Sequence, residues 1–298
     1  MRIVSFLSSA TEIVAALGLA DRLVGISHEC DFPAHVLDLP VVSRSRFDPQ
    51  GLTSGEVDAA VRRSMEEFGS VYTVDEGLLR ELHPDLILTQ AVCEVCAVPT
   101  GAVERAAEGL PDPVETLSLD AHTLEGMLGT ISRVADAAGV PERGDAVVAR
   151  LRGRLNAVAE RVGGRRRPRT LALEWLDPPF APGHWLPEMV VVAGGANLLG
   201  SAGAPSREAE WAELHGLDPE ILCLLPCGWV IEAARAYADR HRERVRSVAP
   251  GARAWVGAGS FFSRSGPRLV DGTEALAAAL HPEVFEQGPP AGVLEPWS

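Results

Sequence analysis

The chain has 298 residues, of which 46% are hydrophobic, and a formal net charge of −14 at pH 7. This length is sufficient for two domains of ordinary size, each with an apolar core of its own. The negative charge repels phosphate backbones and anionic membrane surfaces, which disfavours nucleic acid and lipid as main partners. The composition favours a globular protein that binds a small neutral or cationic ligand, or another protein.

The first 25 residues contain apolar runs that the letters SSATE interrupt. A membrane-spanning helix needs about 18 consecutive apolar residues, and no signal peptide is visible, so we expect no membrane insertion. This pattern predicts a cytoplasmic protein, in which reducing conditions keep cysteines as thiols.

The first part of the chain alternates short apolar runs with amphipathic stretches. RIVSF at 2–6 predicts a buried strand, and 9–18 predicts a helix that a capping box, Ser9 to Glu12, opens. A second capping box, Thr53 to Glu56, opens the predicted helix at 55–69. The remaining predicted elements of this part are a strand at 22–27, a helix at 76–82 and a strand at 85–90.

A long helical stretch follows. It covers 124–139 and 142–162 and is too long for one ordinary crossover helix. The basic run at 163–169 is interpreted as a solvated linker rather than an anion site. The alternation then resumes, with predicted strands at 170–175, 220–226 and 253–257 and predicted helices at 186–194, 229–245 and 273–281.

Strands that alternate with helices are typical of parallel sheets with helices on both faces. The sequence therefore predicts an α/β protein with two parallel-sheet lobes, joined by a long helical connector, and a ligand cleft between the lobes. We place the N-terminal α/β lobe at 1–120, the connector at 121–167 and the C-terminal α/β lobe at 168–298.

Four of the five cysteines follow predicted strands, where open parallel sheets bind their ligands. They are Cys30, Cys93, Cys96 and Cys227. The Cys-x-x-Cys pair at 93 and 96 can hold zinc or part of an iron–sulfur cluster if other thiolates complete the site. Three interpretations stay open: incidental thiols, a metal or cluster site, and a redox dithiol. The redox interpretation is less favoured because no convincing helix follows the pair to lower a thiol pKa.

Aromatic and polar residues gather after the same strands. Each of them alone is as easily a core residue, but their convergence on one predicted edge favours a small-molecule pocket. The candidate ligand-binding residues are His28, Glu29, Trp175, His184, Trp185, Phe261, Phe262 and Arg264, with Trp229 as a further aromatic wall. No phosphate-binding loop or Gly-x-Gly-x-x-Gly fingerprint follows a predicted strand, so nucleotide binding is unsupported.

Four segments together resemble a known family. They are RIVSFLSSATEIVAALGLADRLVGISHECDFP at 2–33, LHPDLILTQ at 82–90, LEWLDPPFAPGHWLPEMVVVAGGANLLG at 173–200 and GSFFSRSGPRLVDGTEALAAAL at 259–280. With two α/β lobes joined by helix, the chain resembles the helical-backbone class of substrate-binding proteins, specifically the vitamin B12-binding component of ABC importers.

The resemblance implies that cobalamin or another corrinoid is held between two rigid lobes, and that an ABC permease is a partner. The family's aromatic ligand contacts map to Phe47, Trp175, Phe261 and Phe262. Two features depart from the family. The acids that dock on the permease have no evident counterpart, since Gly77 and Trp211 stand near the expected positions, and the four cysteines are not part of the family pattern.

Two functions follow as hypotheses. The first is a non-catalytic binding protein for cobalamin, a related corrinoid or another metal-containing small molecule, without export from the cell. The alternative is a cytoplasmic metalloenzyme or an iron–sulfur or zinc protein on the same fold. In that alternative the four cysteines hold the metal, His28, Glu29 and His184 face the substrate, and His28 or Glu29 acts as general base.

Overall fold

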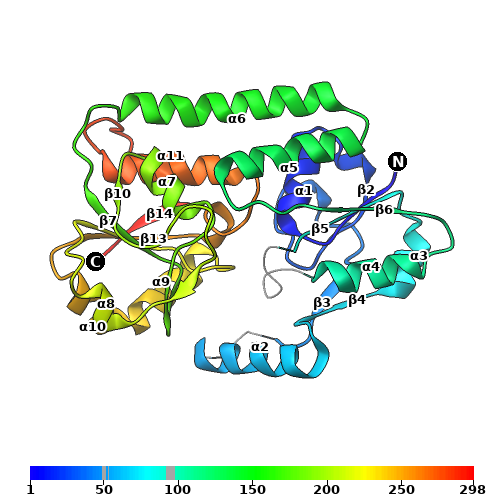
Figure 1. Ribbon diagram of the computed structural model, residues 1–298, viewed down its shortest axis with the longest axis horizontal. Coiled ribbons are helices and arrows are strands. Elements are labelled where there is room, and N and C mark those ends of the chain that lie inside the picture. The colour runs from blue at the N-terminus through cyan, green and yellow to red at the C-terminus, as the bar shows by residue number, and fades with distance from the viewer. Residues whose placement is uncertain (49–51, 53, 92–97) are drawn as a thin grey trace. The chain divides into compact units, whose positions relative to one another are not determined.

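Residues 1–48, 52, 54–91 and 98–298 are described by a computed structural model (Figure 1). The chain divides into two compact units. Unit 1 comprises Met1–Ala121 and Leu128–Val148, and unit 2 comprises His122–Met127 and Ala149–Ser298. The predicted connector helices form α5 (Leu124–Ala137) and α6 (Pro141–Arg161), and each contributes residues to both units. Among the described residues, none of the helices is long and apolar enough to cross a bilayer.

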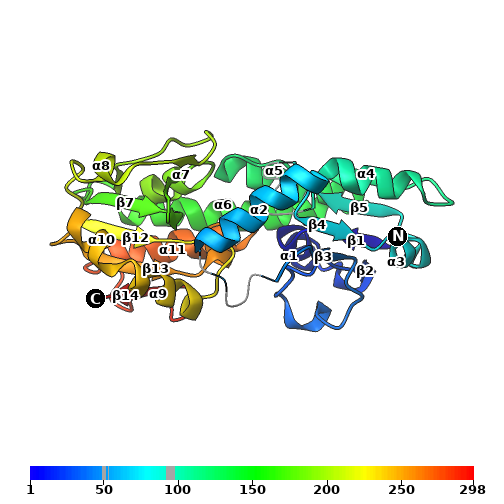
Figure 2. The same ribbon diagram turned by 90° about the horizontal axis from the view of Figure 1, so that it is seen from below.

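The core of unit 1 is a four-stranded parallel sheet with the strand order β2-β1-β5-β6. Because the chain moves outward from β1 to β2 and then returns to β5, the direction of winding reverses between β1 and β5. Right-handed crossovers then place α1 and α4 on opposite faces of the sheet, as Figure 2 shows. The elements are β1 (Ile3–Ser5), α1 (Ser8–Ala16), β2 (Leu23–Gly25), α3 (Glu76–Leu82), β5 (Leu86–Thr89), α4 (Thr100–Glu108) and β6 (Glu115–Ser118).

A two-stranded antiparallel hairpin extends unit 1 beyond its sheet. Its strands β3 (Ser43–Ser45) and β4 (Tyr72–Val74) flank α2 (Ser54–Phe68), which lies away from the sheet in Figure 1. The hairpin is anchored on the core because Val42 is fully buried beside Leu79 and Leu82 of α3.

Unit 2 is built on a five-stranded sheet with the order β10-β7-β12-β13-β14. Its first four strands are parallel, and β14 pairs antiparallel with β13. The winding direction reverses between β7 and β12. These strands are β7 (Arg169–Leu173), β10 (Ala196–Asn197), β12 (Ile221–Leu224), β13 (Arg253–Gly257) and β14 (Leu294–Trp297).

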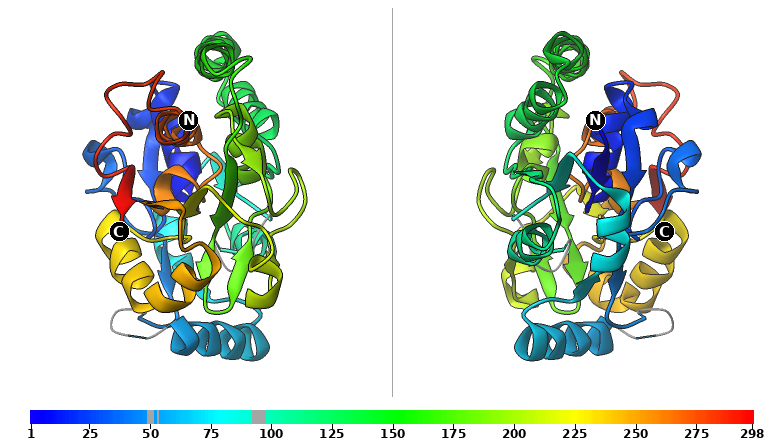
Figure 3. Two further views of the ribbon diagram at one scale, coloured as in Figure 1. Left: turned by 90° about the vertical axis from the view of Figure 1, so that its left-hand side faces the viewer. Right: turned by 90° about the vertical axis from the view of Figure 1, so that its right-hand side faces the viewer.

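Helices cover both faces of this sheet as well. On one face, α9 (Ile231–Arg240) and α10 (Arg242–Val248), yellow to gold in Figure 3, pack on Leu171, Leu222 and Val256. Cys223 alternates with these residues and points to the opposite face, where α7 (Leu186–Val192) packs against α11 (Arg268–Leu280). A smaller antiparallel sheet of β8 (Trp175–Leu176), β9 (Pro179–Ala181) and β11 (Arg207–Glu208) completes the unit, together with α8 (Trp211–Leu214).

The predicted fold class is confirmed, because both units have parallel sheets covered by helices on both faces. Two local predictions were wrong, and a third is untested. The capping box at Ser9 is not formed: α1 begins at Ser8, its N-cap Leu7 makes no side-chain hydrogen bond, and Ser9 is buried within the first turn. The second capping box includes Thr53, which lies outside the described residues. A helix, α4, does follow the Cys-x-x-Cys segment, contrary to expectation.

Candidate functional site

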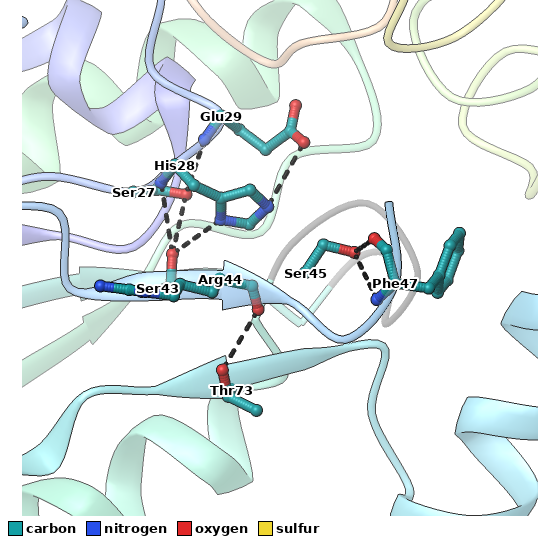
Figure 4. A network of polar contacts seen from close by, with 8 residues as sticks. All are labelled: Ser27, His28, Glu29, Ser43, Arg44, Ser45, Phe47 and Thr73. Atoms are coloured by element: carbon teal, nitrogen blue, oxygen red, sulfur yellow. Dashed lines mark hydrogen bonds and ion pairs between the residues drawn. The ribbon is translucent and has the colours of Figure 1, made fainter. Parts of the chain in front are cut away.

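The carboxyl end of β2 carries a compact polar group in unit 1, the His28 cluster, which consists of Ser27, His28, Glu29 and Ser43 (Figure 4). Nδ1 of His28 lies 2.9 Å from Oγ of Ser43, which in turn donates to Oγ of Ser27 at 3.2 Å. The backbone N–H of Glu29 donates to the same Ser27 hydroxyl at 3.3 Å. Strand β3 supplies Ser43, so the hairpin holds the imidazole against the end of the main sheet.

Both ring nitrogens of His28 face polar groups. Nδ1 is hydrogen-bonded to the hydroxyl of Ser43, which donates to Ser27, and Nε2 faces the carboxylate of Glu29. Nε2 is buried, accepts no hydrogen bond from any described residue, and lies 3.4 Å from Oε1 of Glu29. Burial lowers the pKa of His28 below its ordinary value, and the Glu29 carboxylate partly opposes this shift. The folded chain therefore favours the neutral form of this imidazole.

We expect the pH dependence of unfolding to follow from this shift. The pKa of His28 is below 6.5 in the folded chain and returns to about 6.5 on unfolding, so the unfolded chain binds more protons below that pH. Stability from this residue is therefore complete above about pH 6.5 and falls as the pH falls through that value. Denaturation at about pH 7.5 and 5.5 should give a smaller stability difference in His28→Gln than in the unchanged protein.

Two variants test the cause of the shift. Glu29→Gln removes the charge that raises the His28 pKa, so an NMR titration of that imidazole should show a still lower midpoint. His83→Asn, at an exposed histidine, should leave both the midpoint and the pH dependence unchanged. A His28 midpoint above 6.5 would contradict the burial that the structure shows.

Phe47 lies just beyond β3, where the hydroxyl of Ser45 donates to its carbonyl at 2.6 Å. In Figure 4 its ring points away from His28. Phe47 is half-buried and lies in the same region of unit 1 as the His28 cluster. Its side chain and that of His28 are not in contact in Figure 4.

The predicted four-cysteine site finds no support in the described residues. Cys30 is half-buried, and its sulfur lies 3.1 Å from the hydroxyl of Thr11. Cys227 belongs to unit 2, while Cys93 and Cys96 lie outside the described residues. Within the described part of the chain, no group of three or more histidine, cysteine, aspartate or glutamate side chains has the arrangement of a metal site. The metalloenzyme and iron–sulfur hypotheses therefore have no observation behind them.

An aromatic cluster stands at the carboxyl edge of the sheet in unit 2, where the winding direction reverses. Trp175 follows β7 and Trp229 follows β12, and their ring centroids are 5.1 Å apart. Both rings contact the buried Tyr237 of α9, at 4.9 and 4.5 Å. The Tyr237 hydroxyl accepts a hydrogen bond from the N–H of Leu176 at 2.9 Å. Trp175, Trp229 and Tyr237 are therefore held as one unit, with the two tryptophans partly exposed.

The remaining predicted residues of unit 2 differ in exposure. Phe261 is half-buried and packs on the core next to the aromatic cluster, with Arg268 above its ring. Phe262 is 1% exposed and Trp185 is 7% exposed, and the Trp185 indole N–H donates to the Phe262 carbonyl at 2.6 Å. Their burial makes these two residues supports of the segment 259–264. Arg264 is half-buried within it.

His184 has a partner that the sequence did not indicate. Its Nδ1 lies 3.2 Å from Nδ1 of His122, and both residues belong to unit 2. Burial lowers the pKa of His184, and the nearby His122 lowers it further. His122, Ser43 and Tyr237 were all missed because their positions in the chain carry no motif.

The two units on parallel sheets, joined by helices, give the chain the fold of the helical-backbone class of substrate-binding proteins. A solved structure, a periplasmic heme-binding protein from Pseudomonas aeruginosa, covers 100% of this chain and 98% of its own, with a TM-score of 0.72 and 23% identity. No protein-family model matches the chain.

The similar sequences agree with the resemblance seen in the four segments. A vitamin B12-binding protein from Vibrio cholerae is 22% identical over 287 residues, which cover 94% of this chain and 88% of the relative. An uncharacterized ABC transporter substrate-binding lipoprotein from Bacillus subtilis is 23% identical over 306 residues, covering 96% and 82%. The expected similarity to B12-binding components of ABC importers is confirmed over nearly the whole chain.

The predicted cytoplasmic location is wrong. The chain's relatives include a lipoprotein and a periplasmic binding protein, which are extracytoplasmic classes. The prediction rested on the first residues of the chain alone, whereas the similarity to extracytoplasmic proteins covers nearly the whole chain.

Proposed function

We propose that the protein is the extracytoplasmic binding component of an ABC importer and that its ligand is a metal-centred tetrapyrrole of the corrinoid class. The observation that carries the proposal is the similarity, over 94% of the chain, to a protein named for binding vitamin B12. The partly exposed tryptophans at the carboxyl edge of the unit 2 sheet support it, because ligands of such sheets bind where the winding direction reverses.

The proposed contacts in unit 2 are Trp175, Phe261 and Arg264. Flat aromatic faces suit the large apolar surface of a macrocycle, and a guanidinium donates to the carbonyl oxygens at its rim. Trp185 and Phe262 support these residues from the core. In unit 1 we propose His28, Glu29 and Phe47, all three of which are half-buried.

Charge favours a corrinoid over haem within the tetrapyrrole class. Corrinoids of the cobalamin type carry neutral amide side chains, whereas haem carries two carboxylates. A chain with a formal net charge of −14 repels an anionic ligand more strongly than a neutral one. Haem remains the second candidate because a heme-binding protein shares the fold.

The test is a titration of the purified chain with cyanocobalamin and, in parallel, with hemin, followed by calorimetry and by the visible absorption of the ligand. We expect saturable binding of cyanocobalamin with one ligand per chain. Binding of hemin alone would replace the corrinoid by haem, and binding of neither would remove the tetrapyrrole proposal.

Trp175→Ala should weaken that binding by about 30-fold or more, since aromatic anchors at the centre of an interface contribute about 2 kcal/mol or more to binding. Phe285→Ala is the matched control. Phe285 is a half-buried aromatic residue that stacks with Arg161 beyond the carboxyl end of α11, far along the chain from the aromatic cluster. Equal losses in the two variants would show that the effect of Trp175→Ala is not local to the proposed contact.

A permease is the proposed protein partner. The family resemblance implies docking acids near Gly77 and Trp211, and the structure shows that Glu76, next to Gly77, and Glu210, next to Trp211, are both exposed. Each stands at the start of a short helix, α3 and α8. We propose that these two carboxylates take the role of the docking acids.

A further inference from the structure

Two histidine rings of unit 2 approach each other through their Nδ1 atoms, at a distance that suits metal binding. The Nδ1 atoms of His122 and His184 are 3.2 Å apart, and their ring centroids are separated by 5.3 Å with the planes inclined by 33°. His122 is exposed and His184 is half-buried, so solvent reaches the pair. The two residues are 62 positions apart in the chain.

The backbone on both sides of the pair is firmly held. His184 has a φ of +50°, in the left-handed region that costs free energy for a residue other than glycine. Its N–H donates to Ala204 at 2.6 Å, and its carbonyl accepts from the N–H of Gly203 at 2.8 Å. These two bonds maintain the unfavourable conformation and fix the backbone position from which the His184 side chain projects.

His122 is fixed from the other side. It is followed by Thr123, whose hydroxyl accepts from the N–H of Gly126 at 2.9 Å and caps α5. The N–H of Leu124 donates to Glu188 of α7 at 2.8 Å, which joins the start of α5 to the body of unit 2. The imidazoles are therefore presented by two anchored segments rather than by free side chains on a surface.

We propose that His122 and His184 together bind one divalent transition metal ion of the zinc, copper or nickel class through their Nδ1 atoms. Two nitrogens bound to one zinc ion at about 2.0–2.1 Å in tetrahedral geometry are about 3.3–3.4 Å apart, close to the separation present here. Neutral imidazole is a preferred ligand of all three metals. On binding, the proton shared between the two Nδ1 atoms moves to Nε2 of its own ring.

The electrostatic surroundings permit such an ion. The N-terminus of α5 carries partial positive charge, but the carboxylate of Glu188 accepts one of its N–H groups and offsets that charge. No third histidine, cysteine or carboxylate completes the group among the described residues, so water fills the remaining positions of the ion. The pair is a two-ligand site, which binds metal reversibly and leaves coordination positions open.

Calorimetric titration of the tag-free, tetrapyrrole-free chain with zinc chloride tests the proposal. We expect one zinc ion per chain near neutral pH, and binding should weaken at about pH 5.5 because protonated imidazole does not coordinate metal. His122→Ala and His184→Asn should each weaken binding by at least about tenfold. Asparagine tolerates the left-handed conformation, so His184→Asn preserves the backbone.

The control is His83→Asn. His83 is also a histidine with positive φ, at +41°, and is exposed, but it belongs to unit 1 and caps α3. The His83→Asn variant should bind zinc with the same affinity as the unchanged protein. A Cys93→Ser and Cys96→Ser double variant separates the imidazole pair from thiolate binding.

Zinc binding that persists in His122→Ala, or that is lost in the double cysteine variant but not in the histidine variants, would overturn the proposal, as would no binding at all. A nitrogen hyperfine pattern from two imidazoles in the EPR spectrum of added Cu²⁺ would support it independently. Because the experiment uses metal alone, its outcome does not depend on whether the tetrapyrrole proposal holds.

Discussion

Replacing Tyr237 by alanine is expected to lower the free energy of unfolding of unit 2 by about 3–5 kcal/mol, the usual cost of removing a large buried aromatic side chain. Tyr237 is 1% exposed and contacts both Trp175 and Trp229. Its removal leaves a cavity behind the aromatic cluster, so affinity for the proposed ligand should fall with stability.

Tyr237→Phe separates the hydroxyl from the ring. It keeps the packing but leaves the buried N–H of Leu176 without its acceptor, at an expected cost of about 1–3 kcal/mol. Val230→Ala, at an exposed residue just before α9, should change stability by no more than about 0.5 kcal/mol. An alanine variant as stable as the phenylalanine variant would contradict the packing of the ring.

Urea denaturation followed by tryptophan fluorescence suits this measurement. All six tryptophans lie in unit 2, so the signal reports the unfolding of that unit alone. They are Trp175, Trp185, Trp211, Trp229, Trp255 and Trp297.

Gly272→Ala is expected to destabilise unit 2 by about 1–3 kcal/mol, although alanine is intrinsically the better helix former by about 1 kcal/mol. A Cβ at Gly272 would stand 2.2 Å from the carbonyl oxygen of Phe261 and 3.1 Å from Cε of Met189. The first of these is backbone, so α11 must move away from the segment that carries Phe261. Ligand affinity should therefore fall as well.

Gly153→Ala is expected to change the free energy of unfolding in the opposite direction, towards higher stability. Gly153 lies in α6, is exposed, and a Cβ there would meet nothing within 4 Å. The change should stabilise unit 2 by about 0.5–1 kcal/mol through helix propensity alone. If both alanine variants are stabilised, the close approach of α11 to Phe261 is not a real constraint.

The boundaries of some helices and strands were predicted correctly from the residues within and next to them. The helix at 76–82 and the strand at 253–257 are found at the predicted residues. Elements whose boundaries depend on tertiary contacts were predicted less well. The helix predicted at 273–281 starts at Arg268, and Gly272 lies within it in close contact with the backbone of Phe261. The helix predicted at 229–245 breaks at His241, and β14 was missed because Pro296 weakens a strand pattern, although an edge strand tolerates proline.

The positions of several candidate site residues could be predicted for a simple reason. In a parallel sheet all strands end at one edge, so a residue after a strand is placed near the others that follow strands. His28 after β2, Trp175 after β7 and Trp229 after β12 are where this argument expects them. Their role in binding a ligand stays a prediction.

The amino-acid sequence by itself determined the alternation of strands and helices, and with it two parallel α/β units and the edge of each sheet where the candidate residues lie. The folded chain decided the contacts of those residues: Ser43 on His28, Tyr237 behind Trp175, and His122 beside His184. The physical reason is that apolar periodicity is a local property, which each segment carries alone. A hydrogen bond or ring contact between residues that are 15 to 62 positions apart exists only after crossovers, register and core packing have brought their backbones together.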